Sequence, residues 1–551
     1  METSLSRRQL LATVVLFFAA AFLAYGQSLQ NEFVHFDDNY LVFENPAVQT
    51  VTPASLKFIF SSYDPELYIP LTFLSYQIDH LIGGLNPTIF HLTSLILHIF
   101  NALLVAWIVL RLYKRGWIAI LLGLLFLVHP LNTETVAWVS GRKDVLSAFF
   151  FLLSLSTYLQ CKKMGSRKWF MGSIFAFALG LLAKVMVATL PFVLLLIDWR
   201  NGRKINKEAL IEKVPYFLLS AVFIVIALNG KQSVLADSPL ILSILMAFKS
   251  SAFYLQKFVL PTDLSVLYPY TEPITFASPD FFVPLLIIFG IALIAIASLK
   301  RTREISFGLL VALITLAPTF TNYAKAGDVY FASDRYFYLP MIGIILILAL
   351  VLATFSGSNS RRATMTYSLT CVLLTIAIFG TWQRSLVWNN TETLFSNVLT
   401  TYPNSHIAHT KIGALLADKG KITQAKERYE TSLAIRENER ALYNIGIIYI
   451  QENRLYEALE VNRKAVELNP HYAPAHTNAG FLEWKLHNTE QAIFHFEEAI
   501  AYDPFAIDAR VNLAVLLTKE GEFDRVRKLI NEVLAIDPTN KDAGTILEKL
   551  N

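Results

Sequence analysis

Long apolar segments separated by short basic runs fill roughly the first 380 residues of this 551-residue chain. About 20 consecutive apolar residues let a helix cross a bilayer with its backbone polar groups satisfied, so the segments predict membrane-spanning helices. They lie near residues 9–26, 88–112, 117–131, 145–160, 169–184, 186–199, 214–230, 281–299, 305–320, 336–355 and 363–381. The pattern therefore predicts an all-α, multi-pass domain of about eleven spans.

The basic runs predict how this domain is oriented. With eleven spans, every run falls on the same side of the membrane, and the positive-inside rule makes that side cytoplasmic. The runs are Arg7/Arg8, Arg111 to Arg115, Lys162 to Lys168, Arg200 to Lys207, Lys300 to Arg303, and Arg361/Arg362. The N-terminus is thus expected in the cytoplasm. The loops 27–87, 130–144, 231–280 and 321–335, together with the C-terminal region, are expected on the outer side, which would be the periplasm if this is a bacterial inner-membrane protein.

Two segments need a choice between interpretations. Residues 1–26 have the form of a secretory signal or of an uncleaved first membrane helix, and the spans that follow favour the helix. Residues 240–260 are apolar but contain Lys249 and Lys257, and counting them as a span would move a basic run outside. We interpret them as a re-entrant or surface-lying amphipathic helix on the outer side.

The C-terminal region has an internal repeat. Pro470, Pro504 and Pro538 recur every 34 residues, and small residues such as Gly446 and Gly480 occupy the point where two helices cross. This period and these positions are typical of tetratricopeptide repeats, which stack antiparallel helix pairs into a solenoid. About four repeats are predicted over 404–540, the last one a capping unit. Such arrays bind peptides or protein partners, with a spacer or a dimer surface as the alternative.

Charge and cysteine content support this division. Residues 401–551 contain 18 Lys and Arg against 22 Asp and Glu, whereas residues 1–400 contain 29 against 21. The basic excess is explained by membrane topology, so nucleic acid is not expected as a partner. Two isolated cysteines, Cys161 and Cys371, exclude a disulfide framework and a zinc site. The predicted domains are a transmembrane domain over 1–388, a linker over 389–403 and a repeat domain over 404–551.

Ionisable residues gather in the predicted outer loops. The first loop, "FVHFDDNYLVFENP", contains the adjacent Asp37 and Asp38. Charge at a membrane boundary is costly unless it is paired, snorkelling or functional. An Asx-turn, a simple Lys143–Asp144 loop pair or a snorkelling lysine would explain single members, but four separate segments contribute. The other members are His129, Glu134, Arg142, Asp144, Lys184, Asp334 and Arg335.

Carboxylates beside Arg and Lys at a membrane face suit a reaction whose donor is a lipid-linked phosphate. A carboxylate would take a proton from the nucleophile, and the cations would hold the phosphate as it leaves. The lipid tail would lie in a groove between helices.

These residues resemble the motifs of a known family. "FDDNYLVFENPAV", "HPLNTETVAWVSGRKDVLS", "AKV", "DRYFYLP" and the junction "RSLVWNNTETLF" resemble, in that order, motifs of the TMTC-type proteins. These are multi-span O-mannosyltransferases of the GT-C class with C-terminal tetratricopeptide repeats. The resemblance implies transfer of a sugar, typically mannose, from a polyprenyl phosphate to a protein Ser or Thr on the non-cytoplasmic face, and we expect a bacterial relative.

By this resemblance Asp37 or Asp38 is the general base of an inverting step, and Arg142, Lys184 or Arg335 steadies the departing phosphate. His129, Glu134, Asp144 and Asp334 are expected to support them. Alternatively, the aspartate pair holds a divalent cation. The family's "AKE" is "AKV" here, so Val185 removes a carboxylate beside Lys184. The rival hypothesis is a non-enzymatic membrane scaffold that recruits envelope partners through its repeats, and a transporter comes third.

Overall fold

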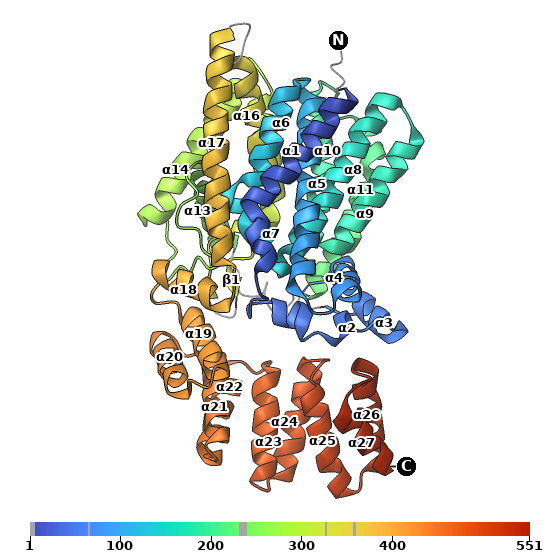
Figure 1. The fold of residues 1–551 in the computed structure, drawn as a ribbon, viewed down its shortest axis with the longest axis vertical. Coiled ribbons are helices and arrows are strands. Elements are labelled where there is room, and N and C mark those ends of the chain that lie inside the picture. Colours follow the sequence, from blue (N-terminus) through green and yellow to red (C-terminus); the bar gives the residue numbers. More distant parts are fainter. Residues whose placement is uncertain (1–5, 64–66, 231–239, 326–327, 356–359, 551) are drawn as a thin grey trace. The chain divides into compact units, whose positions relative to one another are not determined.

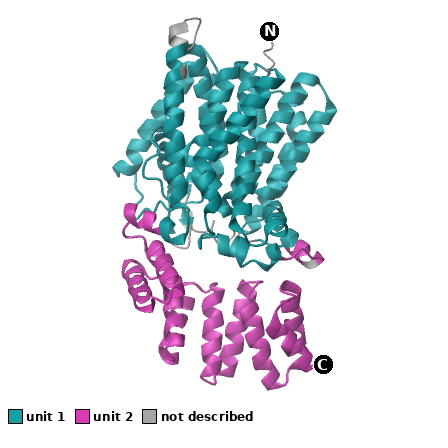
Figure 2. Ribbon diagram, viewed as in Figure 1, with its two compact units in different colours: residues 1–49, 59–394 teal, residues 50–58, 395–551 magenta. Residues whose placement is uncertain are grey.

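A computed structural model describes residues 6–63, 67–230, 240–325, 328–355 and 360–550 of the chain (Figure 1). The described residues are mostly helical, as predicted, and the one paired sheet among them has two short strands. The chain divides into two compact units (Figure 2). Unit 1 comprises Met1–Gln49 and Ile59–Leu394, and unit 2 comprises Thr50–Phe58 and Phe395–Asn551.

Each of the eleven predicted apolar segments forms a helix of unit 1 (Figure 1). These helices are α1 (Arg7–Tyr25), α5 (Pro87–Tyr113), α6 (Gly116–Val128), α8 (Arg142–Met164), α9 (Arg167–Ala183), α10 (Leu190–Arg200), α11 (Lys207–Gly230), α14 (Pro279–Ser298), α15 (Glu304–Leu316), α16 (Met341–Phe355) and α17 (Ser360–Val387). Among the described residues, six helices are long and apolar enough to cross a membrane, or seven if α6 and the bent segment after it are one span. The number of about eleven spans therefore stays a prediction.

Short elements gather at one end of unit 1, which we call the loop end. They include η1 (Gly26–Gln30), η2 (Asn39–Phe43), α2 (Pro46–Gln49), α4 (Pro70–Gly83), η3 (Pro130–Asn132), α7 (Thr133–Ala137), η4 (Val139–Gly141), η5 (Val185–Thr189), η6 (Ala317–Thr319), β1 (Ala324–Lys325), β2 (Asp328–Val329) and η7 (Asp334–Phe337). The antiparallel β1 and β2 pair Ala324 with Val329. At the loop end, the segment after α1 meets the segment after α17, because the Glu32 backbone N–H donates to the Asn389 carbonyl at 2.8 Å.

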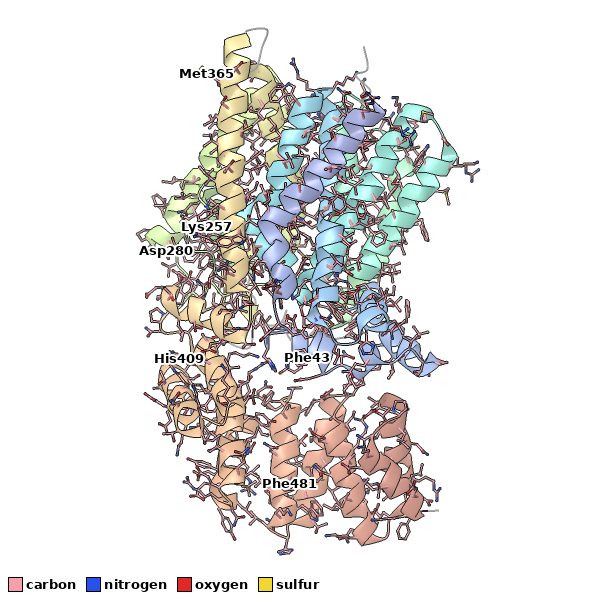
Figure 3. The ribbon with its side chains drawn as sticks, viewed as in Figure 1. Phe43, Lys257, Asp280, Met365, His409 and Phe481 are labelled. Carbon is pink, nitrogen blue, oxygen red and sulfur yellow. The ribbon has the colours of Figure 1, made fainter. Side chains whose placement is uncertain are left out.

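The basic runs meet at the opposite end of unit 1. Glu304 accepts from Arg200 Nε at 2.9 Å and from the Tyr113 hydroxyl at 2.7 Å. Glu212 lies 2.8 Å from Lys162 and 2.7 Å from Arg203. In Figure 3, Met365 lies near this basic end, whereas Phe43 lies at the loop end. The described helices thus carry basic runs from distant parts of the sequence to one end, as the positive-inside pattern requires. The side chains of Arg361 and Arg362 lie outside the described residues.

Helix α13 (Leu240–Val259) covers the segment that we predicted to lie on the outer surface. Phe258 stacks on His129 at 4.9 Å, Tyr254 stacks on Phe337 at 5.2 Å, and Lys249 pairs with Asp280 at 2.9 Å. These partners belong to the loop end or to the first residues of α14. α13 therefore packs on loop-end residues along its second half, and its place at the outer membrane surface stays a prediction.

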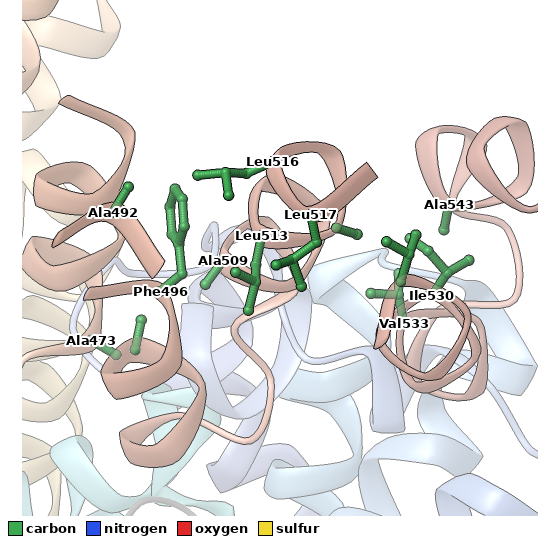
Figure 4. Packing of buried hydrophobic residues seen from close by; sticks show 13 residues of the cluster. Ala473, Ala492, Phe496, Ala509, Leu513, Leu516, Leu517, Ile530, Val533 and Ala543 are labelled. Atoms are coloured by element: carbon green, nitrogen blue, oxygen red, sulfur yellow. The ribbon is translucent and has the colours of Figure 1, made fainter. Parts of the chain in front are cut away.

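Unit 2 is built from antiparallel helix pairs. Its helices are α19 (His406–Asp418), α20 (Ile422–Ile435), α21 (Glu439–Gln451), α22 (Leu455–Leu468), α23 (Ala473–Lys485), α24 (Thr489–Tyr502), α25 (Ile507–Glu520), α26 (Phe523–Ile536) and α27 (Lys541–Leu550). A Cβ on Gly480 would lie 2.8 Å from the Phe496 ring, which explains the small residue at this crossing. Phe496, Leu513 and Ile530 belong to the core shown in Figure 4.

The ends of the repeat domain differ from the expected boundaries in two ways. Much of the predicted linker 389–403 is a helix, α18 (Thr391–Thr401), and the border between the units falls inside it. At the other end, α27 follows the unit predicted to cap the array, and its Ala543 belongs to the same core as Val526. Residues 50–58 of the first loop, at the start of α3 (Pro53–Ser61), also belong to unit 2, where the Phe58 and Phe505 rings lie 4.1 Å apart.

Candidate active site

Asp38 is buried and saturated with hydrogen bonds. One carboxylate oxygen accepts from the Val34 backbone N–H at 3.0 Å, and the other accepts from the Ser140 backbone N–H and hydroxyl at 2.9 and 2.5 Å. The side chain is only 1% exposed. Burial raises the pKa of Asp38 to about 6, although the bonds from Ser140 and Val34 oppose this rise. Asp38 thus ties the first loop to the segment before α8.

Asp37 differs from its neighbour in exposure. Its side chain is 39% exposed, and its Oδ2 lies 3.6 Å from the Nζ of Lys143, which is nearly buried. The two adjacent aspartates therefore have separate environments, since one is locked inside the protein and the other faces the surface beside a cation.

A second ion pair brings α7 and η7 together. Arg335 Nη1 donates to Glu134 Oε1 at 2.5 Å, and the Ser333 hydroxyl donates to the same oxygen at 2.8 Å. Glu134 is 1% exposed, and its Oε2 has no hydrogen-bond partner within the described part of the chain. The pair places a guanidinium and a buried carboxylate oxygen at the loop end.

A third ion pair links α8 to the end of α9. Lys184 Nζ donates to Asp144 Oδ1 at 2.5 Å, and both side chains are largely buried. Lys184 also lies 5.9 Å from the ring centre of Tyr336, while the guanidinium carbon of Arg335 lies 5.2 Å from the same ring. Tyr336 therefore connects the second and third ion pairs.

Trp138 connects the remaining cation to this group. Lys143 Nζ lies 5.3 Å from its ring centre and the Arg335 guanidinium carbon lies 5.1 Å away. Trp138 also stacks on Trp388 at 5.7 Å. We call Lys143, Lys184 and Arg335 the cation cluster. The rings of Trp138 and Tyr336 link these three side chains, and each of the three is paired with one carboxylate.

The structure pairs Lys143 and Asp144 with other partners and adds Trp138 to this site. The simple Lys143–Asp144 loop pair, one alternative considered from the sequence, is not formed, because Lys143 pairs with Asp37 and Asp144 pairs with Lys184. Trp138 was not singled out as a site residue. An aromatic residue within a loop of ionisable residues, "TVAWVSGRKD", was the available signal.

Arg142 lies apart from the cation cluster. Its guanidinium donates to Asp79 at 2.8 Å, to the Ser94 hydroxyl at 2.8 Å, to the Phe90 carbonyl at 2.5 Å and to the Ser75 hydroxyl at 3.3 Å. The side chain is fully buried. Its guanidinium N–H groups donate to residues of α4 and α5, and its role as a phosphate ligand stays a prediction.

His129 and Asp334 also have partners away from the cation cluster. The His129 ring bonds to the Phe258 carbonyl of α13 through Nε2 at 3.0 Å. Asp334 accepts from the Tyr268 hydroxyl at 2.7 Å, and burial, with Glu134 nearby, raises its pKa to about 7. Both residues shape the loop end around α13, and their supporting role stays a prediction.

The expected alternative of a cation site has a limited set of ligands. Within the ranges that the structure describes, no group of three or more His, Cys, Asp and Glu side chains is arranged to hold a metal ion. Three of the site's carboxylates, Asp37, Asp144 and Glu134, are instead paired with Lys143, Lys184 and Arg335 in that order.

Known proteins resemble this chain both in its C-terminal repeats and over most of its length. The tetratricopeptide repeat family matches residues 439–472 and 483–550. Human protein O-mannosyl-transferase TMTC1 is 25% identical over 494 residues, which cover 78% of this chain and 56% of that protein. Human protein O-mannosyl-transferase TMTC4 is 26% identical over 492 residues, which cover 75% and 64%.

Over most of its length, the chain is a homologue of the TMTC O-mannosyl-transferases. It spans between about half and two thirds of the length of the two human relatives. Among solved structures, pilF of Pseudomonas aeruginosa is 22% identical with a TM-score of 0.27, over 31% of this chain and 78% of that protein.

Proposed function

We propose that this chain is a membrane glycosyltransferase that acts on proteins, as the names of its TMTC homologues suggest. The donor is a polyprenyl-phosphate-linked sugar, with mannose the first choice, and the acceptor is a Ser or Thr hydroxyl. The reaction takes place at the loop end, on the non-cytoplasmic side, and the N-terminus is cytoplasmic.

One observation carries this proposal: an accessible carboxylate, Asp37, stands beside a cluster of three cations. Asp38 is a poor base by comparison, because both of its oxygens already accept hydrogen bonds inside the protein. We therefore assign Asp37 as the general base and Asp38 as the residue that positions it.

The proposed step keeps its charges balanced. Asp37 takes the proton of the acceptor hydroxyl while that oxygen forms a bond to the anomeric carbon from the face opposite the phosphate. The bond from the anomeric carbon to the phosphate oxygen breaks, which inverts the configuration and gives the phosphate one more negative charge. Since Asp37 loses its charge in the same step, Lys143 becomes free to stabilise the phosphate together with Arg335 and Lys184. Arg142 is left out, because its donors are engaged elsewhere.

A small apolar cavity lies between α5, α8, α10, α15 and α16. Leu339, four positions after Arg335, lines it near the loop end, and Leu112 and Ile197 line it near the basic end. Its lining is aliphatic and aromatic apart from Thr315. The enclosed space holds about one water molecule, so the polyprenyl tail of the proposed donor would lie in a groove between helices and not inside this cavity.

The repeats support a protein acceptor. Asn444, Asn478 and Asn512 recur every 34 residues on α21, α23 and α25, the first helices of three consecutive pairs. The Nδ2 of Asn478 is buried without a hydrogen-bond partner in the described structure. An amide both donates and accepts, so a row of asparagines suits the backbone of an extended peptide. We propose that the acceptor docks on this row.

The test is sugar transfer by membranes that contain the intact protein. Radiolabelled polyprenyl-phosphate sugars serve as donors and envelope proteins as acceptors, at matched protein abundance. Asp37→Asn is expected to lower transfer by roughly 10²- to 10⁴-fold, and Asp38→Asn by less. Asp508→Asn, an exposed aspartate of α25, is the matched control and should transfer normally.

Other outcomes would change the assignment. A larger loss for Asp38→Asn than for Asp37→Asn would make Asp38 the base. Equal transfer by all variants would remove both aspartates from the chemistry. No transfer from any donor, with partners still captured by the repeats, would favour the membrane scaffold over the enzyme.

A further inference from the structure

Trp138 contacts two members of the cation cluster at once. The Nζ of Lys143 lies 5.3 Å from the centre of its ring, and the guanidinium carbon of Arg335 lies 5.1 Å from it. Lys143 is also 3.6 Å from Asp37, and Arg335 donates to Glu134 at 2.5 Å. One ring therefore contacts both the cation beside the proposed general base and a second cation of the cluster.

The spacing of Glu134 and Trp138 in the sequence brings both side chains to Arg335. Glu134 lies in α7, and Trp138 follows the end of that helix four positions later, where its backbone N–H donates to the Glu134 carbonyl at 3.4 Å. Side chains at this spacing lie on the same side of a helix. Here one of them meets the guanidinium with a carboxylate and the other with an aromatic ring.

The indole N–H of Trp138 has no part in these contacts. The side chain is only 1% exposed, and its Nε1 has no hydrogen-bond partner within the ranges that the structure describes. A buried indole N–H usually finds a partner, and leaving it without one costs stability. Trp138 thus acts on its surroundings through the packing and the π-electrons of its ring, and among aromatic rings the indole attracts a cation most strongly.

A ring suits this place because Lys143 and Arg335 repel each other. Both side chains are largely buried, and like charges in such surroundings tend to move apart. The negative face of an aromatic ring attracts both cations without neutralising either of them. A further carboxylate would also hold the two cations, but it would repel an incoming phosphate. The ring therefore holds the cations together and keeps their charge available for an anion.

We propose that Trp138 is a positioning residue of the transferase and holds Lys143 and Arg335 where the phosphate of the lipid-linked donor binds. The inference rests on the proposed function and adds how two of the three cations keep their place before the donor arrives. Trp138 itself takes no part in proton transfer, and it acts on the phosphate only through the two cations.

Trp388 provides a matched control for Trp138. It is also 1% exposed, its Nε1 likewise has no partner among the described residues, and its ring stacks on that of Trp138 at 5.7 Å. In the described part of the chain, the contacts of Lys143 and Arg335 with an indole ring are made with Trp138 and not with Trp388. A change at Trp388 therefore disturbs the packing of the aromatic stack without removing a contact to a cation.

Binding of the leaving group tests this proposal without turnover. The full-length protein in detergent is titrated with a short polyprenyl phosphate that carries no sugar, while Trp138 is replaced by tryptophan analogues with increasing numbers of fluorine atoms. Fluorine withdraws charge from the face of the ring and changes its shape little. The affinity for polyprenyl phosphate is expected to fall with each added fluorine, roughly two- to thirty-fold over the series. The same series at position 388 is expected to leave the affinity unchanged.

The other outcomes would overturn the proposal. An affinity that stays constant over the series at position 138, or that rises, would show that the ring does not position the cations, and the transferase proposal would stand. Equal falls at positions 138 and 388 would assign the effect to the packing of the aromatic stack. Failure of the unmodified protein to bind polyprenyl phosphate would overturn the proposed function as well.

Ordinary substitutions repeat the comparison. Trp138→Leu removes the π-system and should weaken binding of polyprenyl phosphate more than Trp138→Phe, which keeps a smaller ring. Trp388→Leu and Trp388→Phe should bind it equally well. Thermal unfolding of each variant separates lost binding from lost folding, and equal binding by the two variants at position 138 would contradict a role for the ring's charge.

Discussion

The carboxylate of Asp38 accepts hydrogen bonds from both the backbone N–H and the hydroxyl of Ser140, which lies 102 positions later in the sequence. This contact fastens the first loop to η4, next to the start of α8. Because Asp37 precedes Asp38 and Lys143 follows Ser140 closely, the same contact brings Asp37 within 3.6 Å of Lys143. Asp38 therefore anchors the first loop, and Asp37 beside it is the residue that we propose as the general base.

Removing the Ser140 hydroxyl is expected to weaken this anchor. Ser140→Ala deprives a buried carboxylate of a donor, and a hydrogen bond to a charged group contributes about 1.5–3 kcal/mol. Chemical unfolding at neutral pH should show a loss of this size in the free energy of unfolding. Ser156→Ala is the matched control, because the Ser156 hydroxyl is buried without a partner among the described residues, and it should cost under about 0.5 kcal/mol. Equal losses for the two variants would contradict the anchor.

Asp38 should also limit activity on the acid side. Its pKa of about 6 means that it becomes protonated as the pH falls through 6, and a protonated carboxyl cannot accept from all three donors. Protonation changes one of these hydrogen bonds and thereby the position of Asp37 in the first loop, so sugar transfer is expected to fall below pH 6. The free energy of unfolding changes in the opposite direction and rises as the pH falls. The folded pKa lies above the unfolded value of 3.8, so this group's contribution is largest at low pH and falls by about 3 kcal/mol between pH 4 and 6.

The Ser140→Ala variant tests whether Asp38 causes the loss of activity at low pH, which is the acid limb of the pH profile. The Ser140 hydroxyl lowers the pKa of Asp38, so its removal should shift the limb to higher pH in a transfer assay. Asp334→Asn serves as the control, because Asp334 is a second buried carboxyl with a pKa near 7. A limb that disappears in Asp334→Asn and stays in place in Ser140→Ala would belong to Asp334.

Arg142 is expected to stabilise the protein more than it assists catalysis. Arg142→Ala leaves Asp79 buried without its cation, which costs about 3–5 kcal/mol in comparable pairs. Thermal unfolding of the purified protein should show a large drop in Tm. Arg115→Ala, at an exposed arginine, should leave Tm unchanged. Normal Tm in Arg142→Ala with a raised donor KM would instead support direct phosphate binding by Arg142.

The crossing of α15 and α16 should tolerate no side chain at its closest point. A Cβ on Gly308 would lie 2.5 Å from the Gly343 carbonyl, and a Cβ on Gly343 would meet the backbone of α15. Gly343→Ala is therefore expected to force the helices apart and to lower stability by about 1–3 kcal/mol. Since η7, which carries Arg335 of the cation cluster, lies between these two helices in the chain, transfer should fall as well. Gly290→Ala, with open space around its Cβ, should match the unchanged protein in both assays.

Several features followed from the sequence because they depend on local or repeated patterns. The apolar segments became helices, since a long apolar run leaves the backbone few other ways to satisfy its polar groups. The prolines at 470, 504 and 538 set the repeat period, because one helix pair of fixed length buries its face only against the next pair. The basic runs came together at one end, since the helices of unit 1 alternate in direction.

The pairing of the site's charges was decided by the tertiary structure alone. Arg142, Lys143 and Asp144 are consecutive in the first turn of α8, and each has a different partner: Asp79, Asp37 and Lys184. Neighbouring side chains on a helix point in different directions, so adjacency in the sequence does not predict a contact between them. Which partner each side chain meets depends on the helix or loop packed against that side of α8. The sequence by itself thus determined which residues carry the charges, and the packing of distant segments determined which of them form the site.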